Sequence, residues 1–164
     1  MRERHAGRQR CRAQEFDAFV AGAAGRLLHT ATLLTAEPAD PPGANPRAQR
    51  LLTASLARTF ADWERLRGED PYDRTRQELA ARFARASWRH HRPRGGLLDR
   101  LTPQERLVLV LRLYEGVSEE QTAALLGLGR QQVRAVCNRS VATMRGTRGP
   151  TGRRGPARLL GAGP

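Results

Sequence analysis

The feature that most restricts how this chain can fold is a series of helix start and stop signals after residue 101. Thr102 is a good N-cap residue, Pro103 suits the first helical position, and Glu105 completes a capping box. Ser118 and Gln121 form a second capping box, which begins another short helix that ends at a glycine. These signals predict two successive helices, and the first is apolar around so much of its circumference that we expect it to be buried on several sides.

A third helix follows after the turn at residues 127–129 and runs from Arg130 to about Arg145. A short helix, a three-residue turn and a longer basic helix make a helix-turn-helix, whose second helix enters the DNA major groove. On a helical wheel the residues that share one apolar face are Val133, Val136, Cys137, Ser140 and Met144. The opposite and flanking positions hold Gln131, Arg134, Ala135, Asn138 and Arg139. Arg, Gln and Asn match the edges of guanine and adenine, so this face is a candidate DNA-reading surface. The alternative is an ordinary surface helix with solvated charges.

Apolar residues at spacings of three and four predict three further helices in the N-terminal half, over residues 15–35, 47–67 and 73–91. Proline-rich residues 38–46 separate the first two, and glycine or proline ends the others. No segment alternates with the period of two that is typical of a half-buried strand. The predicted fold class is therefore all-α, with a three-helix domain followed by a helix-turn-helix domain.

The charge of the chain predicts a polyanionic partner. The sequence has 29 basic residues, all of them arginine, and 16 acidic residues, which gives a net charge of +13. Residues 74–94 contribute +6 and residues 129–164 contribute +8, so the charge is concentrated on the third helix and on the last helix with its tail. The Gly/Pro/Arg-rich tail, 146–164, and the basic N-terminus, 1–13, are predicted to be disordered, and the simplest interpretation of the tail is a solvated, non-specific extension.

Several classes of function find no support in the sequence. We find no P-loop, nucleophile elbow, metal-ligand spacing or credible pair of acidic residues, so we expect no enzyme activity, metal, cofactor or small-molecule substrate. The cysteines, Cys11 and Cys137, form no CxxC pair, which fits a reducing cytosol. No apolar stretch has the length of a signal peptide core or a membrane span, so we expect a cytoplasmic protein that does not insert into membranes.

The stretch LTPQERLVLVLRLYEGVSEEQTAALLGLGRQQVRAVCNRSVATMR closely resembles region 4 of the extracytoplasmic-function sigma factors of bacterial RNA polymerase, in particular actinobacterial-type members. The stretch EFDAFVAGAAGRLLHTATLLT resembles the first helix of region 2 in that family, and AQRLLTASLARTFADWERL resembles its polymerase-binding helix. The resemblance implies a region 2-like domain over residues 14–92, a short linker over 93–101 and a region 4-like domain over 102–145.

The resemblance also implies a division of labour between promoter DNA and core RNA polymerase. The −35 element would be read by Arg130, Gln131, Gln132 and Arg134, with Asn138 on the same face and Arg139 on a phosphate. The −10 element would be engaged by Arg82, Arg85, Trp88, Arg89 and His90. Core polymerase would be held by Leu51, Leu52, Leu56, Phe60 and Trp63. Melted bases need a basic groove and an aromatic platform, which Trp88 could supply, although an aromatic at helical spacing can equally be a core residue. An anti-sigma factor is a further candidate partner.

Three departures from the family pattern leave two hypotheses open. Where the family has an acidic run of the form A-E-D-L-V-Q-E-A, this chain has residues 48–55 without any carboxylate, and Arg50 adds a positive charge. Phe83 takes the place of the family's asparagine in the −10-reading segment, and the linker is shorter than usual. The first hypothesis is a working, divergent sigma factor. The alternative is a degenerate sigma-like DNA-binding regulator, or an anti-sigma-binding interaction protein, that no longer engages core polymerase.

Overall fold

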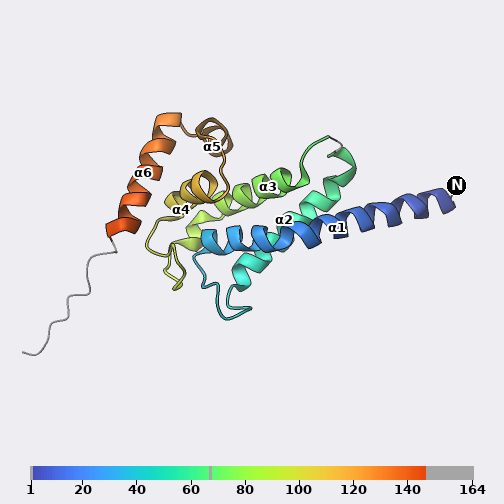
Figure 1. Ribbon diagram of the computed structural model, residues 1–164, viewed down its shortest axis with the longest axis horizontal. Coiled ribbons are helices and arrows are strands. Elements are labelled where there is room, and N and C mark those ends of the chain that lie inside the picture. Colours follow the sequence, from blue (N-terminus) through green and yellow to red (C-terminus); the bar gives the residue numbers. More distant parts are fainter. Residues whose placement is uncertain (1, 67, 147–164) are drawn as a thin grey trace, which may run out of the picture.

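The computed structural model describes residues 2–66 and 68–146, and all regular structure within these ranges is helical, which confirms the all-α prediction (Figure 1). The N-terminal part contains α1 (Arg2–Thr35), α2 (Pro46–Asp62) with the turn η1 (Trp63–Arg65), and α3 (Pro71–Arg85) with the turn η2 (Ser87–His90). The C-terminal part contains α4 (Pro103–Leu109), the π-helical turn η3 (Val110–Tyr114), α5 (Glu119–Leu126) and α6 (Arg130–Gly146). Within the described residues, no helix is both long enough and apolar enough to cross a membrane.

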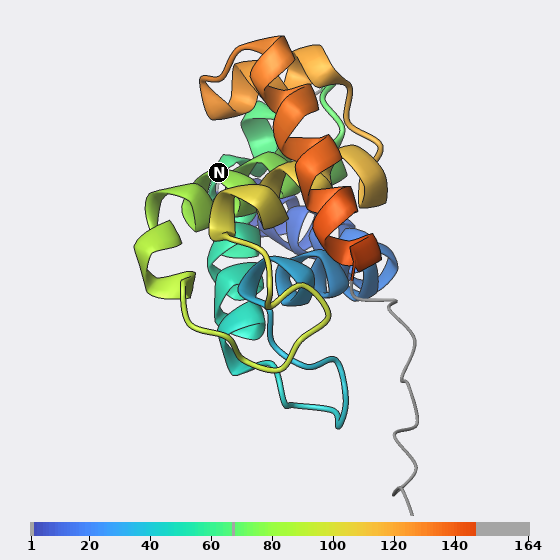
Figure 2. The ribbon, with the colours of Figure 1, turned by 90° about the vertical axis from the view of Figure 1, so that its left-hand side faces the viewer.

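The first three long helices pack against one another and share a core with the C-terminal helices (Figures 1 and 2). Leu27 of α1 and Leu79 and Phe83 of α3 are completely buried, and α2 contributes Ala48 and Leu52. The predicted apolar stripes are therefore correct. The third helix is shorter than expected, because the α-helix ends at residue 85 and residues 87–90 form a separate 3-10 turn.

The first helix is longer than the sequence pattern predicted. It was expected from about residue 15, with residues 1–13 disordered, whereas α1 is helical from Arg2. No proline interrupts this stretch, and a tertiary contact holds it: the guanidinium of Arg12 lies 4.4 Å from the ring centre of Phe60 and donates to the Phe60 carbonyl. A contact between residues 48 positions apart cannot be read from helical periodicity. The N-terminal end of α1 projects beyond the body of the molecule (Figure 1).

The helix-turn-helix forms as predicted. Both capping boxes are present, with Thr102 accepting from the backbone N–H of Glu105 at 3.3 Å and Ser118 from that of Gln121 at 3.1 Å. Gly127 ends α5 with φ of +64°, a left-handed conformation that side chains with a Cβ rarely adopt. The apolar face of α6 is buried at positions 133, 136 and 140, and partly buried at positions 137 and 144. Its polar face is thereby turned to solvent.

The predicted linker, residues 93–101, is folded into the molecule. Leu98 and Leu101 are buried with 5% and 3% exposure, and the N–H of Gly96 donates to the carbonyl of Ala36 at 3.0 Å. A Cβ on Gly96 would lie 2.5 Å from backbone atoms of residues 36 and 37, so only glycine fits this approach. The segment therefore connects η2 to α4 and packs against the end of α1.

Two buried charged side chains of the C-terminal part form hydrogen bonds with the N-terminal elements. Arg106 of α4 is 1% exposed, and its guanidinium donates to the carbonyls of Leu34 (2.8 Å) and His90. The first of these carbonyls lies in the last turn of α1, where it has no partner within the helix and where the helix dipole favours a cation. Arg106 thus satisfies the ends of two N-terminal elements at once.

The second of these side chains is Glu115, which directly follows η3. Its carboxylate accepts hydrogen bonds from the Tyr72 hydroxyl, 3.0 Å from each oxygen, and from the Thr30 hydroxyl. Arg26 lies 3.6 Å from the same carboxylate. Burial and the adjacent negative charge of Glu115 raise the pKa of Tyr72, so its hydroxyl keeps its proton as a donor. Together with Arg106, this contact fixes the two halves of the molecule relative to each other.

Candidate nucleic-acid interface

The polar face of α6 is the most extensive candidate DNA-binding surface. All six side chains predicted to lie on it are exposed: Arg130, Gln131, Gln132, Arg134, Asn138 and Arg139. The opposite face packs on α4 and α5, with Val133 completely buried and Val136 4% exposed. The turn after α5 orients α6 so that its N-terminal half is at the surface, which is the part of a recognition helix that contacts base edges.

Carboxylates of α4 and α5 hold three arginines of this face, a feature that the sequence pattern did not reveal. Arg134 donates to Glu119 from Nε (3.2 Å) and from Nη2 (2.9 Å). Arg130 contacts Glu120 at 2.7 Å. In the same way, Arg139 contacts the α4 capping residue, Glu105, at 3.1 Å. The only signal for these pairs in the sequence is the acidic first turn of each preceding helix, of which Glu105 was interpreted as a capping residue and Glu119 and Glu120 were given no role.

The segment from α3 to η2 carries the second group of predicted DNA contacts. Trp88 is 67% exposed, so it is not a core residue, and the Arg89 guanidinium lies 4.7 Å from the centre of its ring. Arg82 and Arg85 both lie near Glu78, at 2.6 Å and 3.8 Å. One face of the indole is thus covered by a cation, and a base would have to stack on the other face or displace Arg89.

His90 does not belong to this exposed surface, contrary to its predicted place among the −10 contacts. It is 8% exposed, and its ring lies 4.8 Å from that of Phe83. Burial, followed by the nearby Arg106 cation, lowers the pKa of His90 to about 4, so it is neutral at physiological pH. Phe83, which occupies the place of the family's asparagine, is completely buried. Helical spacing alone did not show that η2 turns this histidine inward.

A groove of about 430 Å³ lies between the end of α3 and the start of α4, next to the turn before α6. Its walls include Ser87 and His91, which flank the exposed tryptophan, and Leu128, which lies in the turn before α6. Residues 102–104 at the start of α4 also line the groove, as do apolar residues of α3, α4 and α5. The two segments that would contact separate promoter elements are therefore neighbours in this structure. Among the described residues, no group of three or more His, Cys, Asp or Glu side chains is placed to hold a metal ion.

Comparison with known proteins assigns the family. The family model for sigma-70, region 4, matches residues 97–145, which include the whole helix-turn-helix. The RNA polymerase sigma-E factor of Streptomyces antibioticus is 33% identical, over 80% of this chain and 83% of its own length. The corresponding factor of Streptomyces coelicolor is 29% identical, over 80% of this chain and 84% of its own length. The chain belongs to the extracytoplasmic-function sigma factors. No solved structure gave a significant match.

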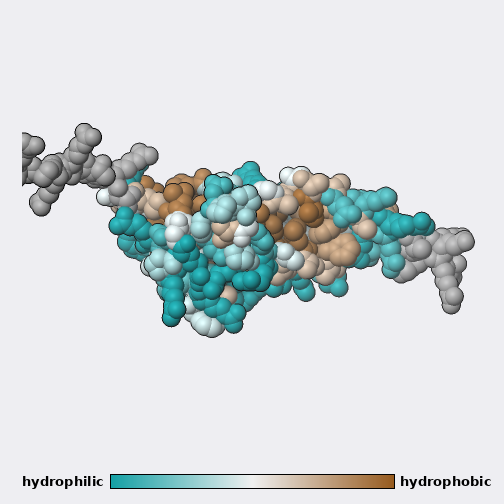
Figure 3. Space-filling view, turned by 90° about the horizontal axis from the view of Figure 1, so that it is seen from below, coloured by the Kyte–Doolittle hydropathy of each residue, from teal (hydrophilic) through white to brown (hydrophobic). Residues whose placement is uncertain are grey.

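In this sigma factor, the stripe predicted to bind polymerase faces mainly inward. Leu52 is buried with 7% exposure, and Leu51 and Leu56 are partly buried against the core. Phe60, 37% exposed, and Trp63 join an aromatic cluster with residues 16 and 19 of α1. Figure 3 shows apolar surface on the body beside the hydrophilic N-terminal end of the chain. A polymerase-binding role for the stripe stays a prediction.

The outer face of α2 is exposed to solvent. A shallow hollow there is lined by Gln49, Arg50 and Thr53 together with neighbouring small residues, and all three of these side chains are exposed. The resemblance placed the acidic run of the family here, and Arg50 lies on this accessible surface.

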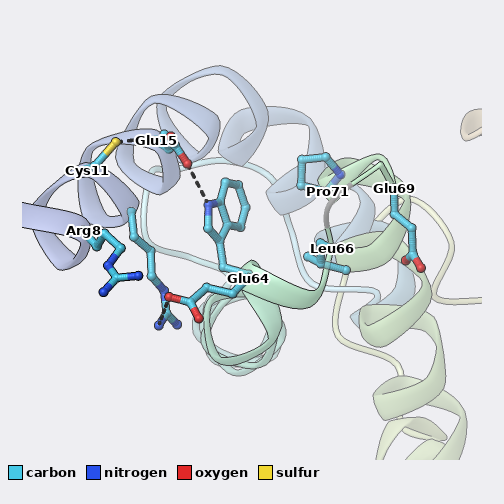
Figure 4. A pocket seen from close by; sticks show the side chains of 9 residues that line it. Arg8, Cys11, Glu15, Glu64, Leu66, Glu69 and Pro71 are labelled. Atoms are coloured by element: carbon cyan, nitrogen blue, oxygen red, sulfur yellow. Dashed lines mark hydrogen bonds and ion pairs between the residues drawn. The ribbon is translucent and has the colours of Figure 1, made fainter. Parts of the chain in front are cut away.

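A second pocket lies between the N-terminal end of α1 and the connection that leads to α3 (Figure 4). The indole Nε1 of Trp63 donates to Glu15 across it at 3.5 Å. Cys11 donates to the same glutamate at 3.4 Å, and this hydrogen bond raises the pKa of the thiol. Because a raised pKa lowers the fraction of reactive thiolate, this geometry does not favour a nucleophilic role for Cys11.

Proposed function

We propose that this chain is a transcription initiation factor that recruits core RNA polymerase to promoters in the cytoplasm. In this proposal α6 reads the −35 element, the α3–η2 segment engages the −10 element, and region 2 contacts core polymerase. The observation that carries the proposal is the exposed row of Arg, Gln and Asn side chains on α6, in a chain that belongs to the sigma-factor family. An anti-sigma factor is a further candidate partner.

Reading both promoter elements at once would require the N-terminal and C-terminal helices to move apart. Elements at −35 and −10 are 25 base pairs apart, or about 85 Å at roughly 3.4 Å per base pair. In this structure the end of α3 and the turn before α6 line one groove of about 430 Å³, so the two candidate segments lie close together. Released from the core, the chain from residue 91 to residue 102 could extend by about 37 Å. We propose that the contacts of Arg106, Glu115 and Gly96 break when both elements are read at once.

The experiment that tests the proposal is retention of core RNA polymerase by the purified full-length chain, followed by run-off transcription from promoter DNA. Retention and promoter-dependent transcripts are the expected results. If core polymerase is not retained at moderate salt while duplex DNA is still bound specifically, the initiation-factor proposal fails and the DNA-binding regulator takes its place. If neither partner binds, an interaction protein directed at another sigma-pathway component is favoured.

A further inference from the structure

The carboxylate of Glu119 is held in a fixed place at the start of α5. It is the first residue of that helix, where the dipole favours a negative charge, and its side chain is 19% exposed. Arg134 contacts both of its oxygens, and Arg112 lies 3.9 Å from one of them. The hydrogen bonds from Arg134 lower the pKa of Glu119, so the carboxylate is charged at neutral pH.

This carboxylate leaves a defined part of Arg134 available. A guanidinium has five N–H donors in a rigid plane. Glu119 occupies the Nε–H and one N–H of Nη2, which leaves both donors of Nη1 and the second donor of Nη2. Those remaining donors form the end of the fork, which matches the O6 and N7 acceptors of guanine in the major groove.

The neighbouring pair on the same two helices lacks this arrangement. The two arginines are equally exposed, at 61% and 62%, but Arg130 contacts its glutamate through Nη2 alone, and Glu120 is 57% exposed where Glu119 is 19% exposed. A single contact between two exposed side chains leaves the guanidinium free to rotate. Arg134 is therefore ordered before DNA arrives, and it gives up less side-chain freedom on binding than a solvated arginine would.

We propose that Glu119 is a positioning residue that orients Arg134 to read a guanine in the promoter. The proposal rests on the proposed function, because it requires α6 to lie in the major groove. A carboxylate at this place could instead compete with DNA for Arg134, and the two roles predict opposite effects on DNA affinity. A carboxylate that merely competed with DNA for Arg134 would weaken binding to every duplex, whereas a positioning carboxylate strengthens binding to the sequence that carries the guanine.

The test uses the full-length chain and a 20-base-pair duplex selected by the wild-type protein from a randomised library. Affinities are measured by fluorescence anisotropy for the selected duplex and for its single-base variants. The proteins are wild type, Arg134→Ala, Glu119→Gln, Glu119→Asp and the double variant Glu119→Gln/Arg134→Ala. Glu120→Gln is the matched control, because it removes the same charge from the same helical turn.

We expect Arg134→Ala to lose a preference for guanine of roughly fivefold to a hundredfold at one position, the range of one bidentate contact. Glu119→Gln should reduce the preference at that same position by about threefold to tenfold, a part of the full contact. Glu119→Asp should do likewise, because it keeps the charge but is too short for the two-point contact. The double variant should match Arg134→Ala, and Glu120→Gln should keep the preference.

Each other outcome overturns a stated step. If Arg134→Ala loses the preference but Glu119→Gln and Glu119→Asp keep it, or bind every duplex more tightly, the positioning role is refuted while DNA reading by α6 stands. If Arg134→Ala changes no base preference, or the wild-type chain selects no sequence, reading by Arg134 fails and the positioning role fails with it. Thermal unfolding of each variant ensures that a loss of binding is not a loss of fold.

Discussion

Replacing Arg106 with methionine should destabilise this protein more than any exposed arginine replacement. The guanidinium is 1% exposed and donates to two backbone carbonyls, those of Leu34 and His90. Burial lowers the pKa of Arg106 to about 10, which leaves it protonated at neutral pH. Methionine fills much of the same volume but donates no hydrogen bond, so the two buried carbonyls lose their partner.

The size of the effect follows from two opposing contributions. A buried acceptor left without a donor costs about 1–3 kcal/mol, so two of them cost about 2–6 kcal/mol. Part of this cost is offset because methionine carries no charge. The buried Arg106 cation is compensated only by two carbonyls and not by a carboxylate, so removing it also removes an unfavourable desolvation energy. We therefore expect a net loss of about 2–4 kcal/mol in the free energy of unfolding. For a chain of 164 residues, this corresponds to a Tm lower by roughly 5–15 °C.

Equilibrium urea unfolding and thermal melts followed by circular dichroism measure this loss. Arg100→Met is the matched control, since Arg100 is exposed, and its free energy of unfolding should change by less than about 0.5 kcal/mol. A loss below about 1 kcal/mol for Arg106→Met, or equal losses in the two variants, would refute the reasoning that the buried guanidinium joins regions 2 and 4.

Three further predictions address other parts of the molecule. Because the folded chain holds the pKa of His90 at about 4 against an ordinary 6.5, the unfolded chain takes up a proton first, and stability should fall by about 2 kcal/mol from pH 7 to pH 5. In urea titrations, His90→Gln should remove that part of the loss, and an equal pH dependence in both proteins would contradict the assignment. Gly96→Ala places a methyl group 2.5 Å from the backbone of Ala36, so the melt should shift downward by the equivalent of about 1–3 kcal/mol, whereas an unchanged melt would show that the segment can move aside. Finally, Arg50→Asp should strengthen retention of core polymerase by about tenfold if this face meets a basic surface, and no gain relative to Arg100→Asp would show that it does not.

The helix-turn-helix could be predicted almost residue by residue, because its signals are local. A capping box joins residues three positions apart, and the left-handed glycine at 127 ends the helix that contains its partners. The polar face of α6 follows from helical periodicity once its ends are known. None of these features depends on what the helices pack against, and all of them appear in the structure at the expected positions.

Predictions that concerned partners across the fold were less successful, for one physical reason. Periodicity shows which side of a helix is apolar, but it does not show which neighbour covers that side. The stripe from Leu51 to Trp63 was assigned to polymerase; the structure adds that α1 covers part of it, and its polymerase-binding role stays a prediction. His90 was placed on DNA, whereas it packs on Phe83. The first helix was expected near residue 15, whereas a contact with Phe60 accompanies its extension to Arg2.

The sequence by itself determined the helical class, the ends of the C-terminal helices and the row of reading side chains, since these depend on contacts within a few residues. Only the tertiary structure decided that Arg106 and Glu115 are buried between the two regions, and that Glu119 holds Arg134 from a different helix. A charged residue in a sequence looks the same whether water, a backbone carbonyl or an opposite charge surrounds it. The distinction depends on chain segments 15 to 85 residues apart that meet only after folding.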